Sequence, residues 1–319
     1  MTLSGCGTAL VTPFRGDGSL DEETLSELVE WQIASGIHFL VACGTTAETP
    51  TLNHQEWLRV IGIVTETAGG RVPVLAGCTH NATHEAVARA GEAASVPGVS
   101  GLLTANPFYN KPGQEGQYRH FRAIAEAVPC PVILYNIPSR TGANLEPATI
   151  LRLAEDVPNI QGVKESSGNL QQIAELIHLL PQSFTVLAGD DVMALPVIAL
   201  GGAGLVSVAS NEIPSEMARL VAAALDGDWA TARALNRRYF RLMTANFWES
   251  SPGPVKCMMA MMGRLQENYR LPMVPVTAAT REKLAIVAEE LGLKGTALRP
   301  SITNTIKAAL AAEGMVQSE

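Results

Sequence analysis

Aromatic side chains and long apolar runs are both scarce in this chain. Phe, Trp and Tyr make up 5% of the 319 residues, and no segment approaches the roughly 20 apolar residues that cross a bilayer. The N-terminus, MTLSGCGTALVTPF, lacks the basic segment and long apolar stretch of a signal peptide. The net charge is −8 and no strongly basic block occurs, which argues against nucleic acid as a partner. We therefore expect a cytoplasmic protein without membrane contact, whose ligands are small molecules.

Paired cysteines are also missing. The five cysteines are odd in number and scattered, and none forms a CxxC pair: Cys6, Cys43, Cys78, Cys130 and Cys257. This pattern favours small buried hydrophobes in a reducing compartment over disulfides. His80 and His84 have the four-residue spacing of a helix-borne metal pair, but no clear third ligand accompanies them. Asn81 is instead predicted to cap a helix, and we expect no metal.

A repeated unit is what the sequence has in abundance. A short apolar run bounded by Gly, Pro or Asn is followed by a small-residue loop and then an amphipathic helical pattern. Eight such runs begin at Gly7, His38, Val72, Val99, Pro131, Ile160, Phe184 and Gly204. Eight strand–helix units within residues 1–225 predict a closed (β/α)8 TIM barrel, an α/β fold. A doubly wound open sheet is the alternative, although no GxGxxG nucleotide fingerprint follows the first run.

The strand pattern stops after about Asp226. Three helical segments follow: 228–247, 253–263 and 277–292. We therefore expect a catalytic barrel domain over residues 1–225, a C-terminal helical domain over 226–294 and a C-terminal tail over 295–319. At the other end of the chain, Asp21 is expected to cap the first helix, because its carboxylate can accept from the free N–H groups of the first turn.

Lys164 is unusual because it ends the sixth apolar run. Strand alternation in IQGVKE places it on the same side as Ile160 and Gly162, and the glycine leaves room beside it. Active groups of TIM barrels lie at the C-terminal ends of strands. Desolvation there would lower the pKa of the amine, and a neutral amine could attack a ketone to form a Schiff base. A lysine that reaches solvent or pairs with Glu165 is an equally good interpretation of its position alone.

Polar residues at the ends of two other runs favour chemistry. Tyr135 ends the fifth run, where its hydroxyl could exchange protons at the barrel mouth. Arg140 follows in the turn SRTG and could hold a carboxylate with two parallel hydrogen bonds. Thr45, after the second run, faces the same mouth. Taken singly, a strand tyrosine usually packs in a core and a loop arginine usually points to solvent.

Six motifs together are specific, although each alone is weak: GTTAETPTLNH, NPFYNKPGQEG, LYNIPSRTGANL, GVKESSGNL, LAGDD and YRLPMVPVT. Through them the chain resembles, over about residues 4–293, the class I pyruvate-dependent lyases of the N-acetylneuraminate lyase superfamily. Within that superfamily it is most similar to the dihydrodipicolinate synthases. The resemblance implies a lyase of lysine and diaminopimelate biosynthesis, which condenses pyruvate with L-aspartate-4-semialdehyde to 4-hydroxy-tetrahydrodipicolinate.

The resemblance also implies a role for each matching residue. Lys164 would form the imine with pyruvate, so that no separate cofactor is needed. Tyr135 would donate and accept the proton at the imine carbon, and Thr45 would relay protons between Tyr135 and Tyr109. In this family the tyrosine that matches Tyr109 reaches into a neighbouring subunit. Members are usually homotetramers built from two tight dimers, and we expect the same here.

Four further positions are implied to bind the substrates. Thr46 would bind the pyruvate carboxylate and Arg140 the carboxylate of the semialdehyde. Carbonyl groups near Gly189 and Val206 would line the pocket. A sister aldolase acting on a sugar acid or 4-hydroxy-2-oxoglutarate would keep Lys164, and a non-catalytic binder on the same barrel is a third possibility. Arg140 favours the synthase, because it suits a short substrate with its own carboxylate.

Two regions depart from the family pattern. Ala47 replaces the second glycine of the usual Gly-Thr-Thr-Gly-Glu loop, which would strain the loop if that position needed a positive φ. The second region is a cleft in which many members bind free lysine. There, Trp57 and Phe108 stand where sensitive enzymes often have histidine and tyrosine, although His54, Asn81 and Glu85 match. These changes predict weak feedback inhibition by lysine, or none.

Overall fold

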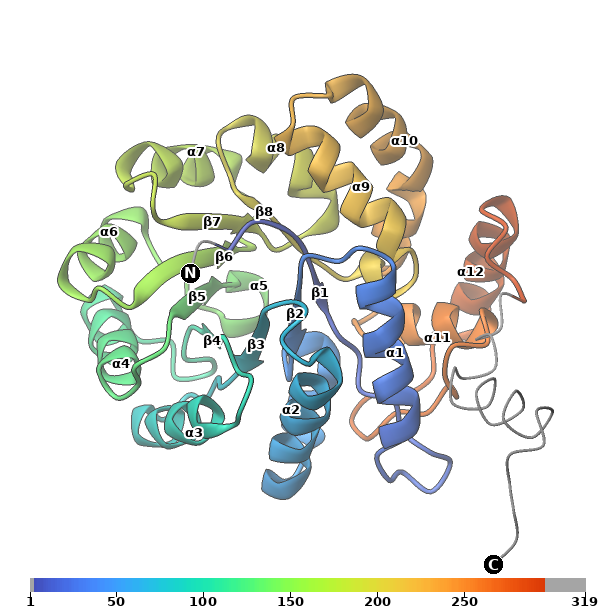
Figure 1. Cartoon of the computed structure of the whole chain (residues 1–319), viewed down its shortest axis with the longest axis horizontal. Coiled ribbons are helices and arrows are strands. Elements are labelled where there is room, and N and C mark those ends of the chain that lie inside the picture. The colour runs from blue at the N-terminus through green and yellow to red at the C-terminus, as the bar shows by residue number, and fades with distance from the viewer. Residues whose placement is uncertain (1–2, 296–319) are drawn as a thin grey trace, which may run out of the picture.

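Eight parallel strands form a closed ring at the centre of the molecule (Figure 1). The structure is a computed structural model that describes residues 3–295. Each strand pairs with the next one in the chain, and β8 closes the ring on β1. The strands are β1 (Gly5–Ala9), β2 (Phe39–Ala42), β3 (Val74–Gly77), β4 (Gly101–Ala105), β5 (Val132–Asn136), β6 (Ile160–Glu165), β7 (Thr185–Ala188) and β8 (Gly204–Ser207). The predicted TIM barrel is confirmed, and the open-sheet alternative is wrong.

Helices surround the ring and cover the outer face of every strand (Figure 1). They are α1 (Glu22–Ala34), α2 (His54–Ala68), α3 (Thr83–Ser95), α4 (Gln114–Glu126), α6 (Pro147–Asp156), α7 (Leu170–Leu179), α8 (Ala194–Ala199) and α9 (Pro214–Leu225). The single turn α5 (Pro138–Thr141) is not part of this outer layer and lies over the ring, beside the end of β5 (Figure 1). The prediction for Asp21 is confirmed, because its carboxylate accepts from the Thr24 N–H at 3.3 Å. The prediction for Asn81 is wrong. Helix α3 begins one residue later, and its N-cap is Ala82, whose methyl side chain cannot accept a hydrogen bond.

The strands are short and apolar because both of their faces are buried. Inward side chains such as Phe39, Leu103 and Leu187 fill the barrel, while outward ones pack against the helices. At the bottom of the barrel a side chain on Gly7 would collide with the Phe39 ring, so the glycine makes room for that ring. The filled interior leaves the ends of the strands as the place where a cavity can form.

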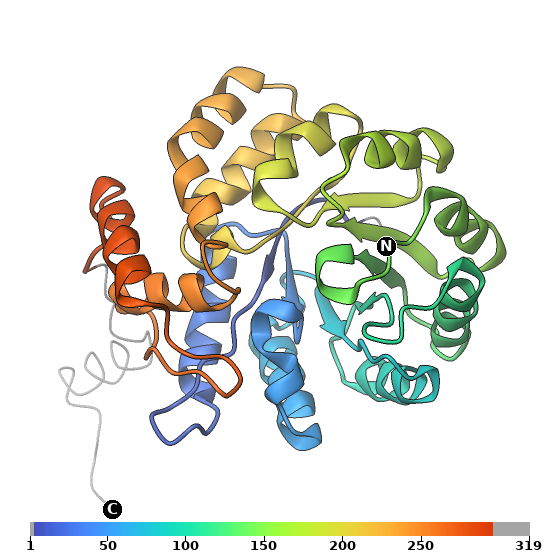
Figure 2. The same cartoon turned by 180° about the vertical axis from the view of Figure 1, so that it is seen from behind.

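The last three helices lie together on one side of the ring (Figure 2). These are α10 (Trp229–Ala245), α11 (Gly253–Met261) and α12 (Ala278–Glu290), and they fall within the three predicted helical segments. We call residues 226–294 the appendix. A division into two domains at residue 226 stays a prediction, and the predicted tail beyond Gly295 lies outside the described residues.

Most of the cysteine side chains are buried, as expected from the sequence. Cys6, Cys43, Cys78 and Cys257 are free and buried, and burial raises the pKa of each thiol, which keeps it protonated. Cys130 is half-buried.

None of the helices between residues 3 and 295 has both the length and the apolar character that crossing a membrane requires.

Candidate active site

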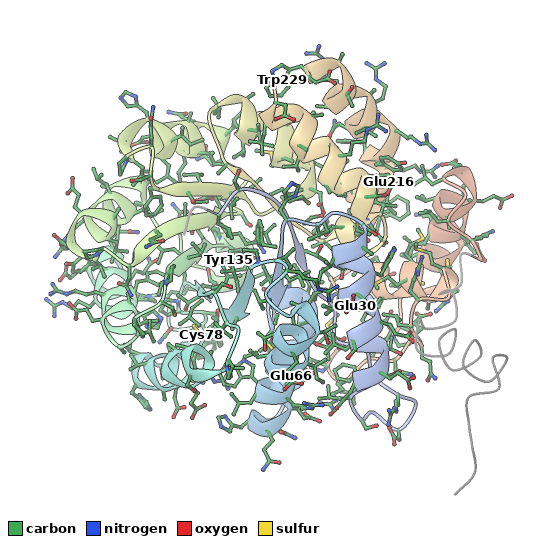
Figure 3. All side chains as sticks on the ribbon, viewed as in Figure 1. Glu30, Glu66, Cys78, Tyr135, Glu216 and Trp229 are labelled. Atoms are coloured by element: carbon green, nitrogen blue, oxygen red, sulfur yellow. The ribbon has the colours of Figure 1, made fainter. Side chains whose placement is uncertain are left out.

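A cavity of about 440 Å³ opens at the C-terminal ends of the strands. Its lining comes from the ends of β2, β5, β6, β7 and β8, the loops after them and the segment between α10 and α11: Thr45, Thr46, Tyr135, Ile137, Ser139, Arg140, Lys164, Ser166, Gly189, Asp190, Val208, Phe247, Glu249, Ser250 and Ser251. Six residues proposed from the sequence are therefore brought to one place. Figure 3 shows one of them, Tyr135, inside the ring, whereas Glu30, Glu66 and Trp229 lie on the surrounding helices.

Lys164 and Tyr135 are neighbours because their strands pair in register. Tyr135 of β5 is the direct partner of Lys164 of β6, so both side chains enter the barrel at the same level. The Lys164 Nζ lies 4.0 Å from the centroid of the Tyr135 ring. Each residue is only 5% exposed. An ammonium over an aromatic face is attracted to the ring, which holds the amine in the cavity.

The Lys164 amine has no acceptor to hold it. Among residues 3–295, no hydrogen bond or ion pair involves its Nζ. Glu165 points the other way, where its carboxylate accepts from the Asn136 side chain at 2.9 Å and from the Ser167 N–H at 2.6 Å. Both alternative interpretations of Lys164, exposure to solvent and pairing with Glu165, are therefore wrong.

Gly189 is close to Lys164 because it has no side chain. A Cβ at this position would collide with the Ser166 Oγ and lie 2.9 Å from the Lys164 Cε. The Ser166 Oγ is buried without a hydrogen-bond partner and lines the cavity. An unpaired buried hydroxyl is costly unless a ligand or water completes it. Ser166 was not proposed from the sequence, although the cluster SSGN follows Lys164 directly.

A second carboxyl group lies in the cavity wall. Asp190 caps the turn after β7, where its carboxylate accepts from the Val192 N–H at 3.3 Å. Burial raises the pKa of Asp190, while the Val192 N–H and the nearby Lys164 charge oppose that shift. Asp190 therefore adds a carboxyl group to the cavity wall near the Lys164 amine.

The loop with Thr45 and Thr46 consists of two short 3-10 turns, η1 (Thr45–Ala47) and η2 (Thr49–Thr51). Ala47 is buried and does not have a positive φ; in this loop Glu48 does, with φ of 54°. The expected strain at Ala47 is therefore absent. Glu48 is also the residue whose importance was missed, because its partner lies more than 200 positions away in the sequence.

Arg140 lies at the mouth of the cavity, on the single turn of α5. Its Nη2 donates to the Ser251 carbonyl at 3.3 Å, which joins the barrel to the appendix. Phe247, Glu249 and Ser250 complete this edge. The sequence carried no signal for them, since they lie in an irregular segment between two helices and meet the barrel only through packing.

Two proposed residues lie outside the cavity of this chain. Tyr109 is 87% exposed, has φ of 70° and is not part of the cavity lining. Val206 is buried in the barrel interior, and Val208 lines the cavity in its place. Thr45 and Tyr135 share the cavity, but within residues 3–295 no hydrogen bond joins their hydroxyls.

The His80 and His84 side chains also have other environments. The His80 Nδ1 accepts from the Ala82 N–H at 3.1 Å, and the His84 Nε2 lies 3.4 Å from Glu85 on the surface. In the part of the chain that the structure describes, no three His, Cys, Asp or Glu side chains gather as metal ligands would.

Comparison with known proteins identifies the family. The model of the Dihydrodipicolinate synthetase family matches residues 2–291. The chain belongs to this family. The 4-hydroxy-tetrahydrodipicolinate synthase of Acidobacterium capsulatum is 67% identical over 92% of this chain and 97% of its own length. That of Koribacter versatilis is 60% identical over the same shares. The crystal structure of dihydrodipicolinate synthase from Aquifex aeolicus superposes with a TM-score of 0.89, at 40% identity, over 92% of this chain and 99% of its own.

Proposed function

We propose that this member of the dihydrodipicolinate synthetase family is a 4-hydroxy-tetrahydrodipicolinate synthase. It condenses pyruvate with L-aspartate-4-semialdehyde through a Schiff base on Lys164. The observation that carries the proposal is the environment of Lys164. The residue is 5% exposed, its Nζ lies 4.0 Å from the Tyr135 ring centroid in the cavity, and no acceptor from the described part of the chain binds this amine. The relatives at 67% and 60% identity support the synthase over the sister aldolases.

The chemistry follows from the placement of two groups. The neutral Lys164 amine attacks the C2 ketone of pyruvate, a C–N bond forms, and water leaves to give the imine. Tyr135 lies beside the reacting nitrogen and supplies and accepts the protons of these steps. Loss of a proton from the methyl carbon gives the enamine, which attacks the aldehyde carbon of the second substrate. The imine nitrogen acts as the electron sink, so the condensation needs no separate cofactor.

Two carboxylates need separate binding groups. Thr46 lies deep in the cavity and is our candidate for binding the pyruvate carboxylate, beside the carbonyl group near Gly189. Arg140 lies at the rim, where the longer second substrate enters, and its planar guanidinium suits a carboxylate. The depth of the two positions matches the order of binding that the imine chemistry requires.

The exposed Tyr109 supports an oligomeric enzyme. An aromatic side chain that is 87% exposed and held at a positive φ is costly on a monomer, unless a partner covers it. We propose that Tyr109 enters a neighbouring subunit's cavity and joins Thr45 and Tyr135 there. A homotetramer made of two tight dimers, working in the cytoplasm, agrees with this arrangement.

Borohydride trapping tests the imine. Incubation with pyruvate and borohydride should add one reduced pyruvate per chain, and peptide mass analysis should locate it on Lys164. Lys164→Ala should show no adduct. The other fully buried lysine, Lys256, serves as an internal control, because three acceptors hold its ammonium. An adduct on another lysine would refute the assignment.

A panel of aldehydes separates the synthase from the sister aldolases. With pyruvate fixed, the highest kcat/KM should belong to L-aspartate-4-semialdehyde. A higher kcat/KM for a sugar-derived aldehyde would show that the chain is one of the sister aldolases. It would leave the assignment of Lys164 as the imine residue unchanged.

A further inference from the structure

A second buried lysine lies outside the cavity. Lys256 of α11 has a side chain that is 0% exposed, as does its partner Glu48, and the Lys256 Nζ lies 2.6 Å from the Glu48 Oε1. The ammonium also donates to the Asn268 carbonyl at 2.6 Å and to the Thr12 carbonyl at 3.1 Å. Three donors thus meet three acceptors, which is the complete set for an ammonium group.

The surroundings favour the charged pair. The Phe14 and Tyr269 ring centroids lie 4.6 and 5.0 Å from the Lys256 Nζ, and aromatic faces attract a cation. Burial lowers the pKa of Lys256, and the Glu48 carboxylate opposes that shift. Well-packed apolar residues often give equal stability where a buried ion pair stands. We therefore infer that this ion pair is present because it fixes the position of one of its two residues.

The geometry in question is that of Glu48. The Glu48 backbone has φ of 54° and ψ of 32°. This is a left-handed conformation that residues other than Gly, Asn and Asp seldom adopt. The Glu48 N–H donates to the Thr45 carbonyl at 3.2 Å and so closes turn η1. The Glu48 carbonyl accepts from the Thr51 N–H at 2.9 Å and so begins turn η2. Such a conformation persists only where surrounding contacts impose it.

Those contacts come from the appendix. Lys256 occupies the Glu48 Oε1, and the Arg270 N–H donates to the Glu48 Oε2 at 3.3 Å. The Arg270 side chain then holds the neighbouring chain with a 3.0 Å bond to the Thr51 carbonyl and two bonds to Glu56. Both oxygens of Glu48 are thus held by residues more than 200 positions away.

We propose that Lys256 is a positioning residue for pyruvate. Through Glu48 it holds the turn that presents Thr45 and Thr46 to the cavity, and it thereby makes the active site depend on the packing of the appendix. The proposal rests on the proposed function, because it assumes that Thr46 binds the pyruvate carboxylate.

The test uses Lys256→Met, Glu48→Gln and the double variant. Each single variant should raise the KM for pyruvate by about 10- to 100-fold, the loss expected when one charge-assisted contact is misplaced. The KM for the semialdehyde should stay within about twofold, and saturating pyruvate should still give the full borohydride adduct on Lys164. The double variant should cost far less than the product of the singles, because the two groups act as one unit.

Arg241→Met is the control, since it removes an ion pair that the appendix makes within itself, with Glu290 at 2.6 Å. Its KM for pyruvate should equal that of the wild type. Glu48→Gln keeps the side-chain size, so the proposal stays testable if Lys256→Met does not fold. An unchanged KM for pyruvate in a folded Lys256→Met or Glu48→Gln protein would overturn the proposal. A wild-type protein that forms no pyruvate adduct would instead refute the proposed function.

Discussion

The two buried lysines Lys164 and Lys256 differ in the hydrogen bonds that their amines make. Lys256 is completely buried, and its ammonium group donates hydrogen bonds to three acceptors. Lys164 is nearly as enclosed, but within residues 3–295 its amine makes no hydrogen bond and lies beside the Tyr135 ring and near the Asp190 carboxyl group. The difference lies in hydrogen-bond satisfaction, which stabilises the ammonium at Lys256 and leaves the amine free at Lys164.

Gly189 should be required for imine formation. A methyl group at this position would push against the Ser166 Oγ and the Lys164 side chain. Displacing a reacting atom by about 1 Å can cost 10²-fold, so Gly189→Ala should slow formation of the borohydride-trapped adduct by about 10- to 100-fold. Gly113→Ala, where a Cβ would meet nothing within 4 Å, is the control. Equal adduct rates in both variants would show that the space above Lys164 is not limiting.

Arg140 should select the semialdehyde and not pyruvate. Arg140 lines the same cavity as Lys164 but is an exposed residue, and we propose that it binds the second substrate. Loss of a charged hydrogen bond is worth roughly 1.5–3 kcal/mol, so Arg140→Ala should lower kcat/KM for the semialdehyde by about 10- to 100-fold, while pyruvate still gives a normal adduct. A parallel loss of adduct would place the arginine in the pyruvate site or make it structural through Ser251.

At the scale of elements, the strand ends present the chemistry and the loops after them shape it. Asp191 illustrates how a loop is attached to the barrel. Its carboxylate accepts from Ser207 Oγ at 2.5 Å and from the Val208 and Ala209 N–H groups at 3.2 and 3.0 Å. These bonds join η3 (Asp191–Met193) to the end of β8 at the cavity wall.

Stability should fall as the pH rises through the titration of Asp191. Burial raises its pKa from 3.8 to about 6, so the folded chain binds a proton that the unfolded chain has already released between these values. The contribution of Asp191 to the free energy of unfolding is therefore fully present below about pH 4 and is lost by pH 7. The change is about 3 kcal/mol at 1.36 kcal/mol per pKa unit. Asp191→Asn should lack this component in unfolding experiments at pH 4.5, 6 and 7.5. Parallel pH profiles of the two proteins would contradict the assignment.

We predict that lysine inhibits this chain weakly or not at all, because of Trp57 on α2 and Phe108 after β4. Trp57 is 2% exposed, and its indole N–H already donates to the Gly77 carbonyl at 3.0 Å. Neither Trp57 nor Phe108 therefore offers a free donor to a ligand carboxylate. Two lost partners at roughly 1–3 kcal/mol each weaken binding by about two to four decades. Initial rates at saturating pyruvate should be insensitive to lysine up to the millimolar range. Half-inhibition well below one millimolar would show that the cleft binds lysine despite these residues.

At the scale of the whole molecule, a single chain does not bring together the three residues of the proposed relay. Thr45 and Tyr135 lie in its cavity, whereas its Tyr109 lies on the surface. If the partner supplies that hydroxyl, two defective chains should repair each other. Lys164→Ala and Tyr109→Phe proteins, each nearly inactive, should regain about a quarter of the wild-type activity when co-expressed in equal amounts, because half of the random dimers carry one intact site.

The control replaces the Tyr109→Phe chain by one that carries both substitutions, and this mixture should stay inactive. Activity of the first mixture that merely equals the sum of its parts would show that Tyr109 acts within its own chain or not at all.

Local pattern in the sequence determined the barrel and the core of the site. Eight apolar runs predicted eight strands, since a strand buried on both faces must be apolar along its length. Strand alternation and the position of a strand end also placed Lys164 and Tyr135 at one mouth, because parallel strands of a barrel all end there. Asn81 was misjudged as a cap because nothing local showed that α3 would begin one residue later.

Only the tertiary structure decided which distant groups complete the site. The segment with Phe247 and Glu249, and the ion pair of Lys256 with Glu48, come from the packing of the appendix on the barrel. A contact across 200 residues leaves no periodicity, since each partner sits in a local pattern of its own. The environment of Lys164 is also a tertiary feature. The sequence places a lysine at a strand end, but only the packing of residues 3–295 around it shows that none of them provides an acceptor for its amine.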